Sequence, residues 1–269
     1  MTKKFLAAVA ACFIGTAAPA IGADMLVKAP PPAPAPIYSW TGFYVGGNIG
    51  YSWGVSDPNV NFFDPSGFTI ATATNTFGMN GVVGGGQAGY NRQTGNWVWG
   101  AEADIQASGQ RGTGNFPCAA GVCSTTGLQV NEALNQKLDW FGTVRGRLGF
   151  TVTPTILLYG TGGLAYGDIA TDGLISDPKA FSLNTLKTGW TAGGGIEASV
   201  SHDWTVKLEY LYMDLGDVSS NGLTTTGILI PGVPHNGPPI ANRLSTNFIA
   251  SGPGITDNIL RLGLNYKFY

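Results

Sequence analysis

Residues that could carry out acid–base or nucleophilic chemistry are few and widely separated in this 269-residue chain. It has two histidines, His202 and His235, and no G-x-S-x-G motif. A hydrolase or transferase active site needs a histidine beside carboxylates or a serine. His202 lies in a short turn-like segment, and His235 lies in a Pro/Gly-rich stretch without a convincing set of partners. The sequence therefore predicts no catalytic residues and no enzymatic activity.

Two segments match the dinucleotide-binding pattern G-x-G-x-x-G or its variant that ends in Ala. One begins at Gly84 and the other at Gly160. The pattern binds phosphate when it joins a strand to a helix, because the helix N-terminus then faces the ligand. Both segments lie inside sequence with strand-like alternation, so we expect neither to bind a nucleotide. No cofactor is predicted.

The N-terminus has the layout of a secretory signal peptide. Lys3 and Lys4 precede an Ala-rich apolar run that ends in small residues at Ala23. The uninterrupted apolar core is shorter than the roughly 20 residues that a helical membrane span needs. We expect residues 1–23 to be removed on export, and residues 24–40, dominated by Pro and Ala, to form a periplasmic tether that packs into no core.

The exported part of the chain holds two cysteines, Cys118 and Cys123, in a polar Gly/Thr-rich segment. An oxidising compartment permits a disulfide between them. A metal site is the weaker alternative, because no histidine lies nearby to complete a ligand set. We therefore predict a possible local disulfide and no metal site.

Charged side chains recur at every second position in several segments. Glu102 and Asp104 form one such pair, and Arg145 and Arg147 form another. Because alternate residues of a strand face the same side, the charges share one face and the apolar residues share the other. Eight segments show this alternation: 41–54, 81–93, 97–108, 136–150, 155–168, 187–200, 204–217 and 257–269.

The connections between these segments alternate in length. Those at 94–96, 151–154 and 201–203 have the length and residue types of tight turns. The others are long Gly/Ser/Thr/Asn/Pro-rich stretches at about 55–80, 109–135, 169–186 and 218–256. An even number of antiparallel strands follows, with the short turns at one end and four long loops at the other.

The apolar face carries aromatic residues near the strand ends. They include Trp53, Trp97, Trp99, Trp140, Tyr166, Trp190, Trp204 and Tyr212. A soluble β-sandwich also alternates, but it seldom places all its long loops at one end. Aromatic girdles, short turns and long loops together are typical of transmembrane barrels, in which closure leaves no unpaired edge in hydrocarbon. The sequence predicts an all-β fold, an eight-stranded antiparallel up-and-down transmembrane β-barrel over residues 41–269.

The polar face then encloses the lumen. The predicted lumen charge network consists of Glu102, Asp104, Asp139, Arg145, Arg147, Glu197, Lys207, Glu209 and Arg261. Eight strands leave an interior only wide enough for side chains to fill it. Opposite charges this crowded should pair, because an unpaired buried charge is far more costly. We interpret these residues as a structural plug; a selectivity filter is the alternative.

The charge of the whole chain excludes one class of partner. Only 11% of the residues are charged, and the formal net charge is −2. Nucleic-acid binding requires a basic surface, and none remains after the signal peptide. No nucleic-acid partner is predicted.

Several stretches resemble a known family. They are 39-SWTGFYVGGNIGYSWG-54, 145-RGRLGF-150, 158-LYGTGGLAYG-167, 207-KLEYLYMDLG-216 and 262-LGLNYKF-268, with the Pro-rich lead at 23–32. They look like the small porin-like outer-membrane β-barrel proteins of alphaproteobacteria, a family that includes major surface antigens. The resemblance implies an eight-stranded barrel in the outer membrane, in contact with outer-membrane lipid and lipopolysaccharide. The resemblance implies no catalytic residues in this chain.

The C-terminal strand also resembles the assembly signal read by the outer-membrane insertion machinery. Arg261, Gly263, Tyr266 and Phe268 fit that signal's pattern, although Tyr269 follows the expected terminal Phe. The leading functional hypothesis is a non-enzymatic structural anchor that displays surface loops. The alternatives are a narrow porin for small solutes and an adhesin or receptor surface on the 218–256 loop. The sequence identifies no external ligand.

Overall fold

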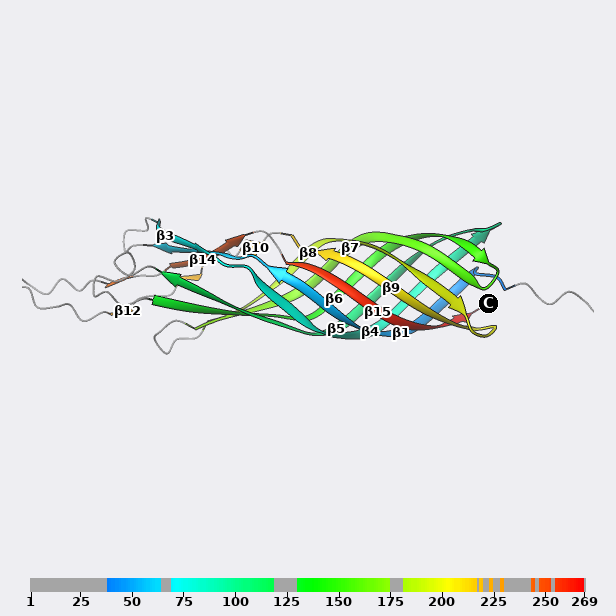
Figure 1. Cartoon of the computed structure of the whole chain (residues 1–269), viewed down its shortest axis with the longest axis horizontal. Coiled ribbons are helices and arrows are strands. Elements are labelled where there is room, and N and C mark those ends of the chain that lie inside the picture. Colours follow the sequence, from blue (N-terminus) through cyan, green and yellow to red (C-terminus); the bar gives the residue numbers. More distant parts are fainter. Residues whose placement is uncertain are drawn as a thin grey trace, which may run out of the picture. The chain divides into compact units, whose positions relative to one another are not determined.

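The computed structural model describes residues 38–63, 69–118, 130–174, 181–216, 218–219, 223–224, 228–229, 243–244, 247–252 and 255–268. Eight long strands within these ranges close into a barrel in the order β1-β15-β9-β8-β7-β6-β5-β4 (Figure 1). Their bounds are β1 Gly42–Ser56, β4 Phe77–Thr94, β5 Trp97–Cys118, β6 Val130–Thr153, β7 Ile156–Leu174, β8 Phe181–Ser199, β9 Trp204–Asp214 and β15 Thr256–Phe268. No helix in this part of the chain has the length and apolar character needed to cross a membrane.

Closure of the barrel depends on the first and last long strands. β1 pairs with β15 from Phe43 opposite Phe268 to Val55 opposite Thr256, and every other neighbouring pair in the ring is also antiparallel. A closed ring removes the edges whose unpaired backbone groups would otherwise be left in hydrocarbon. The predicted eight-stranded up-and-down barrel is confirmed.

Short turns join the strands at one end, which we call the turn end. Gly95 and Asn96 connect β4 to β5, and Pro154 and Thr155 connect β6 to β7. Gly95 has a φ of 61°, a left-handed conformation that glycine adopts without steric cost. β8 and β9 are joined by residues 200–203. The three predicted tight turns therefore lie together at one end.

The opposite end, the loop end, is more ordered than the sequence suggested. β5 to β8 continue well into the predicted loops, so that β5 ends at Cys118 instead of near 108. Within the described residues, seven short strands also form there: β2 Asn59–Phe63, β3 Thr69–Thr74, β10 Val218–Ser219, β11 Leu223–Thr224, β12 Ile228–Leu229, β13 Arg243–Leu244 and β14 Asn247–Gly252. β14 pairs with β2, so segments of the first and last predicted loops join in one sheet.

The outward face of the barrel is apolar and ends in two aromatic belts. Leu164, Ile49 and Val82 lie between the belts and are more than half exposed. The turn-end belt contains Phe43, Tyr90, Trp97, Trp99, Phe150, Trp204, Tyr266 and Phe268, and the loop-end belt contains Trp53, Trp140, Tyr166, Trp190, Tyr210 and Tyr212. This arrangement matches the lipid-facing surface of a transmembrane barrel.

A β-bulge changes the direction of the side chains in β5 and β6. The pairing register shifts between Ala107 and Gln110 on β5 and between Leu138 and Trp140 on β6. Leu138 is therefore fully buried, whereas Trp140, two residues later, is 36% exposed. Simple alternation places both residues outside and Asp139 in the lumen. That placement of Asp139 is wrong: its side chain is exposed, because the extra residue of a bulge breaks the period of two.

Candidate functional site: the filled interior of the barrel

Eight charged side chains from five strands meet in the middle of the barrel, and each is at most 5% exposed. We call them the central charge network: Glu102, Asp104, Arg145, Arg147, Glu197, Lys207, Glu209 and Arg261. All eight side chains point inward. Successive residues of a strand face opposite sides, and the neighbours of these charged residues are on the outward face. These are the predicted lumen residues except Asp139.

Arg145 lies at the centre of the central charge network. Its Nη2 is 2.5 Å from Glu102 Oε1 and 3.0 Å from Asp104 Oδ2, and its Nη1 is 3.2 Å from Glu209 Oε1. Its Nε donates to Thr143 Oγ1 at 2.9 Å. One fully buried guanidinium thus neutralises and orients carboxylates from two different strands, β5 and β9.

Two further cations, Arg261 and Lys207, pair with the same carboxylates. Arg261 donates from Nε to Glu209 Oε2 at 2.6 Å and from Nη2 to Asp104 Oδ2 at 2.9 Å. Lys207 Nζ donates to both oxygens of Glu102 at 2.8 Å. The last strand, β15, is thereby tied through its own buried arginine to β5 and β9.

Arg147 extends the network towards the turn end. Its Nη2 donates to Glu197 Oε2 at 2.6 Å, and Thr205 Oγ1 donates to the other oxygen of that carboxylate at 2.6 Å. The guanidinium carbon lies 4.0 Å from the ring centroid of Tyr159, close enough for a cation–π interaction. The Tyr44 hydroxyl accepts a bond from Arg147 Nη1 at 3.0 Å. Aromatic rings and ion pairs therefore share the same layer.

The central charge network contains four carboxylates and four cations, so its formal charge is zero. Charges removed from water are tolerated when each has an opposite partner and further hydrogen bonds. The network also crosses the interior, since it links β5, β6, β8, β9 and β15. This arrangement suits a polar plug better than a path for a hydrated ion.

A mainly apolar cluster occupies the interior towards the loop end, together with the buried polar side chains of Ser52, Ser56, Gln110, Gln136 and Asp257. This loop-end apolar layer consists of Phe77, Met79, Val83, Phe116, Leu134, Leu138, Phe141, Ala165, Ile169, Leu211, Met213, Leu215, Ile255 and Ile259. The sequence prediction missed it by assigning a uniformly polar lumen. Leu211 and Met213 lie at inward positions between outward aromatics, so β9 is apolar on both faces there. A continuous apolar run of this kind is a signal of burial on both sides.

A smaller cluster fills the interior at the turn end. This turn-end apolar layer contains Tyr38, Trp40, Val98, Leu157 and Tyr159. The expectation that residues 24–40 pack into no core is wrong for the last of them, because Trp40 is only 1% exposed. Leu157 and Tyr159 lie on the inward face of β7 and pack with Trp40. This contact explains why two large, mainly apolar side chains occur on this face.

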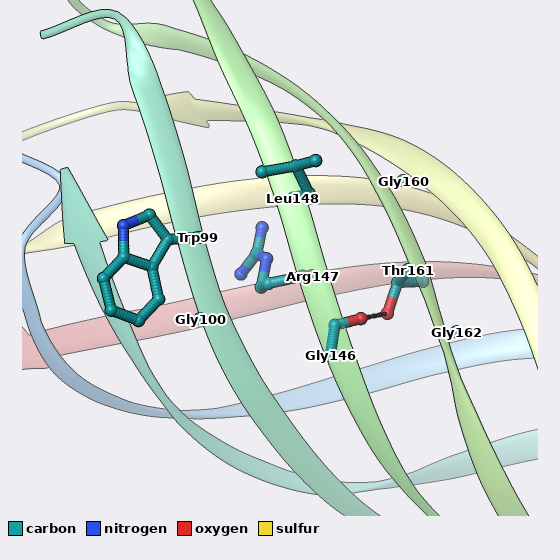
Figure 2. Close-up of a pocket in the computed structure, with 8 residues that line it drawn as sticks. All are labelled: Trp99, Gly100, Gly146, Arg147, Leu148, Gly160, Thr161 and Gly162. Carbon is teal, nitrogen blue, oxygen red and sulfur yellow. Dashed lines mark hydrogen bonds between the residues drawn. The ribbon is translucent and has the colours of Figure 1, made fainter. Parts of the chain in front are cut away.

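The outward surface carries a shallow groove of about 360 Å³, shown in Figure 2. Its floor is low because Gly146, Gly160 and Gly162 have no side chains, and Trp99 and Leu148 form its walls. Thr161 Oγ1 donates to the Gly146 carbonyl at 2.9 Å. The groove lies among residues of the apolar outward face, and the Arg147 side chain bonds Glu197 in the interior. An apolar groove of this kind suits contact with lipid.

The residues that resemble an assembly signal all lie on β15, but they have different surroundings. Tyr266 and Phe268 face outward, with their ring centroids 5.1 Å apart. Arg261 belongs to the central charge network. A Cβ added to Gly263 would lie 3.0 Å from the Lys207 side chain, so this position favours glycine.

Several predicted features lie outside the described residues. They are the signal peptide at 1–23, the disulfide between the side chains of Cys118 and Cys123, His235 and Tyr269. Among the residues that are described, no three His, Cys, Asp or Glu side chains gather in a way that could hold a metal ion.

Comparison with known proteins gives consistent matches. The model of the family described as "Outer membrane protein beta-barrel domain" matches residues 6–268. The chain is 41% identical over 281 residues to the 31 kDa outer-membrane immunogenic protein of Brucella melitensis, covering 100% of both chains. It is 34% identical over 179 residues to the 22 kDa outer membrane protein of Rhizobium leguminosarum, covering 66% of each. The crystal structure of OprG from Pseudomonas aeruginosa matches 86% of this chain and 98% of its own, with 12% identity and a TM-score of 0.49.

Proposed function

Because the chain belongs to the family of outer membrane protein β-barrel domains, we propose that it is a closed anchor whose loop end is displayed outside the cell. It is an integral outer-membrane surface protein of the alphaproteobacterial type. The proposal concerns how the barrel acts in that membrane: as a rigid, non-conducting and non-enzymatic support.

The observation that carries this proposal is the filled interior. A central charge network of zero formal charge lies between two layers of buried, mainly apolar side chains, so the interior is packed with side chains at all three levels. A porin needs a continuous polar path, and an eight-stranded barrel is already narrow enough for side chains to fill it. The packing therefore favours the anchor over the narrow porin.

We also propose that the protein has no catalytic activity. Its Brucella relatives are named as immunogenic proteins, and those names describe recognition by the immune system instead of a reaction. His202, the one histidine in the described ranges, lies exposed in the turn-end connection between β8 and β9. The four carboxylates of the central charge network are all engaged with cations, which suits a structural role.

The partners that we propose follow from the membrane location. The two aromatic belts and the apolar band between them would contact phospholipid and lipopolysaccharide. The outer-membrane insertion machinery would recognise β15 through Arg261, Gly263, Tyr266 and Phe268.

A second candidate function is favoured by the sheet at the loop end. β2 and β14 come from opposite ends of the sequence and pair directly, so the first and last loops form one folded surface. Thr72 and Asn61 face each other on this sheet, with Thr72 Oγ1 donating to Asn61 Oδ1 at 2.8 Å. A sheet that joins two loops far apart in the sequence would suit an adhesin or receptor face.

The displayed-anchor proposal predicts opposite accessibility of the two ends. An epitope tag inserted at 175–180, between β7 and β8, should bind antibody on intact cells. The same tag inserted between Gly95 and Asn96 should bind only after the outer membrane is permeabilised. Equal binding of both tags on intact cells, or the reverse pattern, would contradict the proposed orientation.

A further inference from the structure

The segment that precedes β1 turns sharply into the barrel mouth. Gly42, the first residue of β1, has a φ of 144°, a region that side-chain-bearing residues rarely adopt. A Cβ at this position would lie 2.5 Å from the Phe268 carbonyl oxygen. Only glycine fits here, and its conformation directs residues 38–41 across the turn end instead of away from it.

Trp40 fixes this segment to two sides of the mouth. Its backbone N–H donates to Gln93 Oε1 on β4 at 2.8 Å, and its indole Nε1–H donates to the Pro154 carbonyl at 3.2 Å. Gln93 N–H in turn donates to Thr41 Oγ1 at 2.9 Å. The segment is therefore bonded both to β4 and to the turn between β6 and β7.

A third attachment reaches the last strand. Lys267 Nζ donates to the Ser39 carbonyl and lies 4.6 Å from the ring centroid of Tyr38. Tyr38 stacks edge-on against Trp40, with ring centroids 5.0 Å apart. Because Lys267 belongs to β15, this attachment is complete only after β15 has paired with β1.

The segment also covers the central charge network. Trp40 packs with Leu157 and Tyr159, and the Tyr159 hydroxyl donates to Glu209 Oε1 at 2.9 Å. The Arg147 guanidinium carbon lies 4.0 Å from the ring centroid of Tyr159, so this ring contacts both Trp40 and the network. Water that entered at the turn end would first have to displace Trp40.

We propose that residues 38–41 form a latch, hinged at Gly42, that shuts the turn-end mouth over the central charge network. The latch controls whether water and small solutes reach the network from that side. This inference deepens the closed-anchor proposal and rests on it, since the loop-end apolar layer must close the other end.

The test is the rate at which a buried thiol reacts with a small, water-soluble, positively charged thiosulfonate. Leu157→Cys places the reporter beneath the latch, in the protein purified from outer membranes with Cys118 and Cys123 replaced by Ser; Cys12 belongs to the predicted signal peptide. Trp40→Ala should speed labelling at least about tenfold, because a covered site reacts in proportion to its open population. Trp204→Ala is the matched control, since this turn-end tryptophan faces outward, and it should leave the rate unchanged.

A second pair of variants tests the hinge without touching the apolar contacts. Gly42→Ala should also speed labelling, whereas Gly47→Ala should not, because a Cβ at Gly47 would meet only the Gly85 carbonyl oxygen at 3.7 Å. Equal labelling rates in the Trp40→Ala and Trp204→Ala proteins would overturn the latch. So would rapid labelling when the latch is intact.

A reporter in the loop-end apolar layer separates the two proposals. Phe141→Cys should stay protected in every variant, because Phe141 is fully buried beyond the central charge network. Rapid labelling of Phe141→Cys with an intact latch would contradict the closed anchor itself. Protection of Phe141→Cys, with no effect of Trp40→Ala on Leu157→Cys, would reject the latch alone.

Discussion

Replacing Arg145 by methionine should destabilise the folded barrel by about 3–5 kcal/mol, the usual cost of removing one partner from a buried ion pair. Methionine keeps much of the length and apolar volume of the side chain but removes the charge. Glu102, Asp104 and Glu209 would then face each other with one cation fewer, in a site that water does not reach. The free energy of unfolding, measured by urea titration of the protein in lipid vesicles, checks this expectation.

Lys137→Met is the matched control for Arg145→Met. Lys137 Nζ also pairs with a carboxylate, Asp172 Oδ2, at 3.4 Å, but both side chains are about one-third exposed. Exposed pairs contribute only about 0–1 kcal/mol, so this variant should remain close to the wild type. A loss of stability no larger in Arg145→Met than in Lys137→Met would show that the central charge network does not hold the barrel together.

Deleting Phe268 and Tyr269 should leave most of the protein in the periplasm. The proposed assembly signal ends at Phe268, and truncation would remove the residue that completes its aromatic pattern. Phe268 is 47% exposed on the outward face, so its loss leaves no hole in the core and should disturb assembly more than packing. Fractionation of cells, followed by immunoblotting of the periplasmic and outer-membrane fractions, measures this effect.

Two substitutions control for the loss of an aromatic side chain from the turn-end belt. Phe43→Leu and Phe150→Leu each remove an exposed ring from the same turn-end belt but leave the C-terminus intact. Both should reach the outer membrane in normal amounts. Normal outer-membrane levels of the truncated chain would argue against β15 as the signal.

Alternation in the sequence was enough to predict the barrel and most of its inner face. Residues such as Glu102 and Arg261 differ from their neighbours in polarity, and a period of two assigns them to the inside directly. The aromatic belts were predictable for the same reason, since Trp97 and Trp190 occur near the ends of the alternating segments 97–108 and 187–200, on the apolar face. These features depend only on local strand geometry.

The errors arise where the structure depends on contacts between distant segments. Asp139 was misplaced because a bulge between β5 and β6 reverses the alternation, and no local residue type announces it. The loop-end sheet requires β2 to meet β14, nearly 190 residues later in the chain. Trp40 belonged by composition to a Pro/Ala-rich tether, yet its partners lie on β4, β7 and the turn between β6 and β7.

The central claim is that the interior is closed, with charges neutralised in the middle and apolar layers at both ends. Conductance of the purified protein in a planar lipid bilayer tests it most directly. The closed anchor predicts that insertion of the barrel produces no stable current steps. Steady ohmic channels, lost when the lumen is blocked, would contradict the account and identify the protein as a narrow porin.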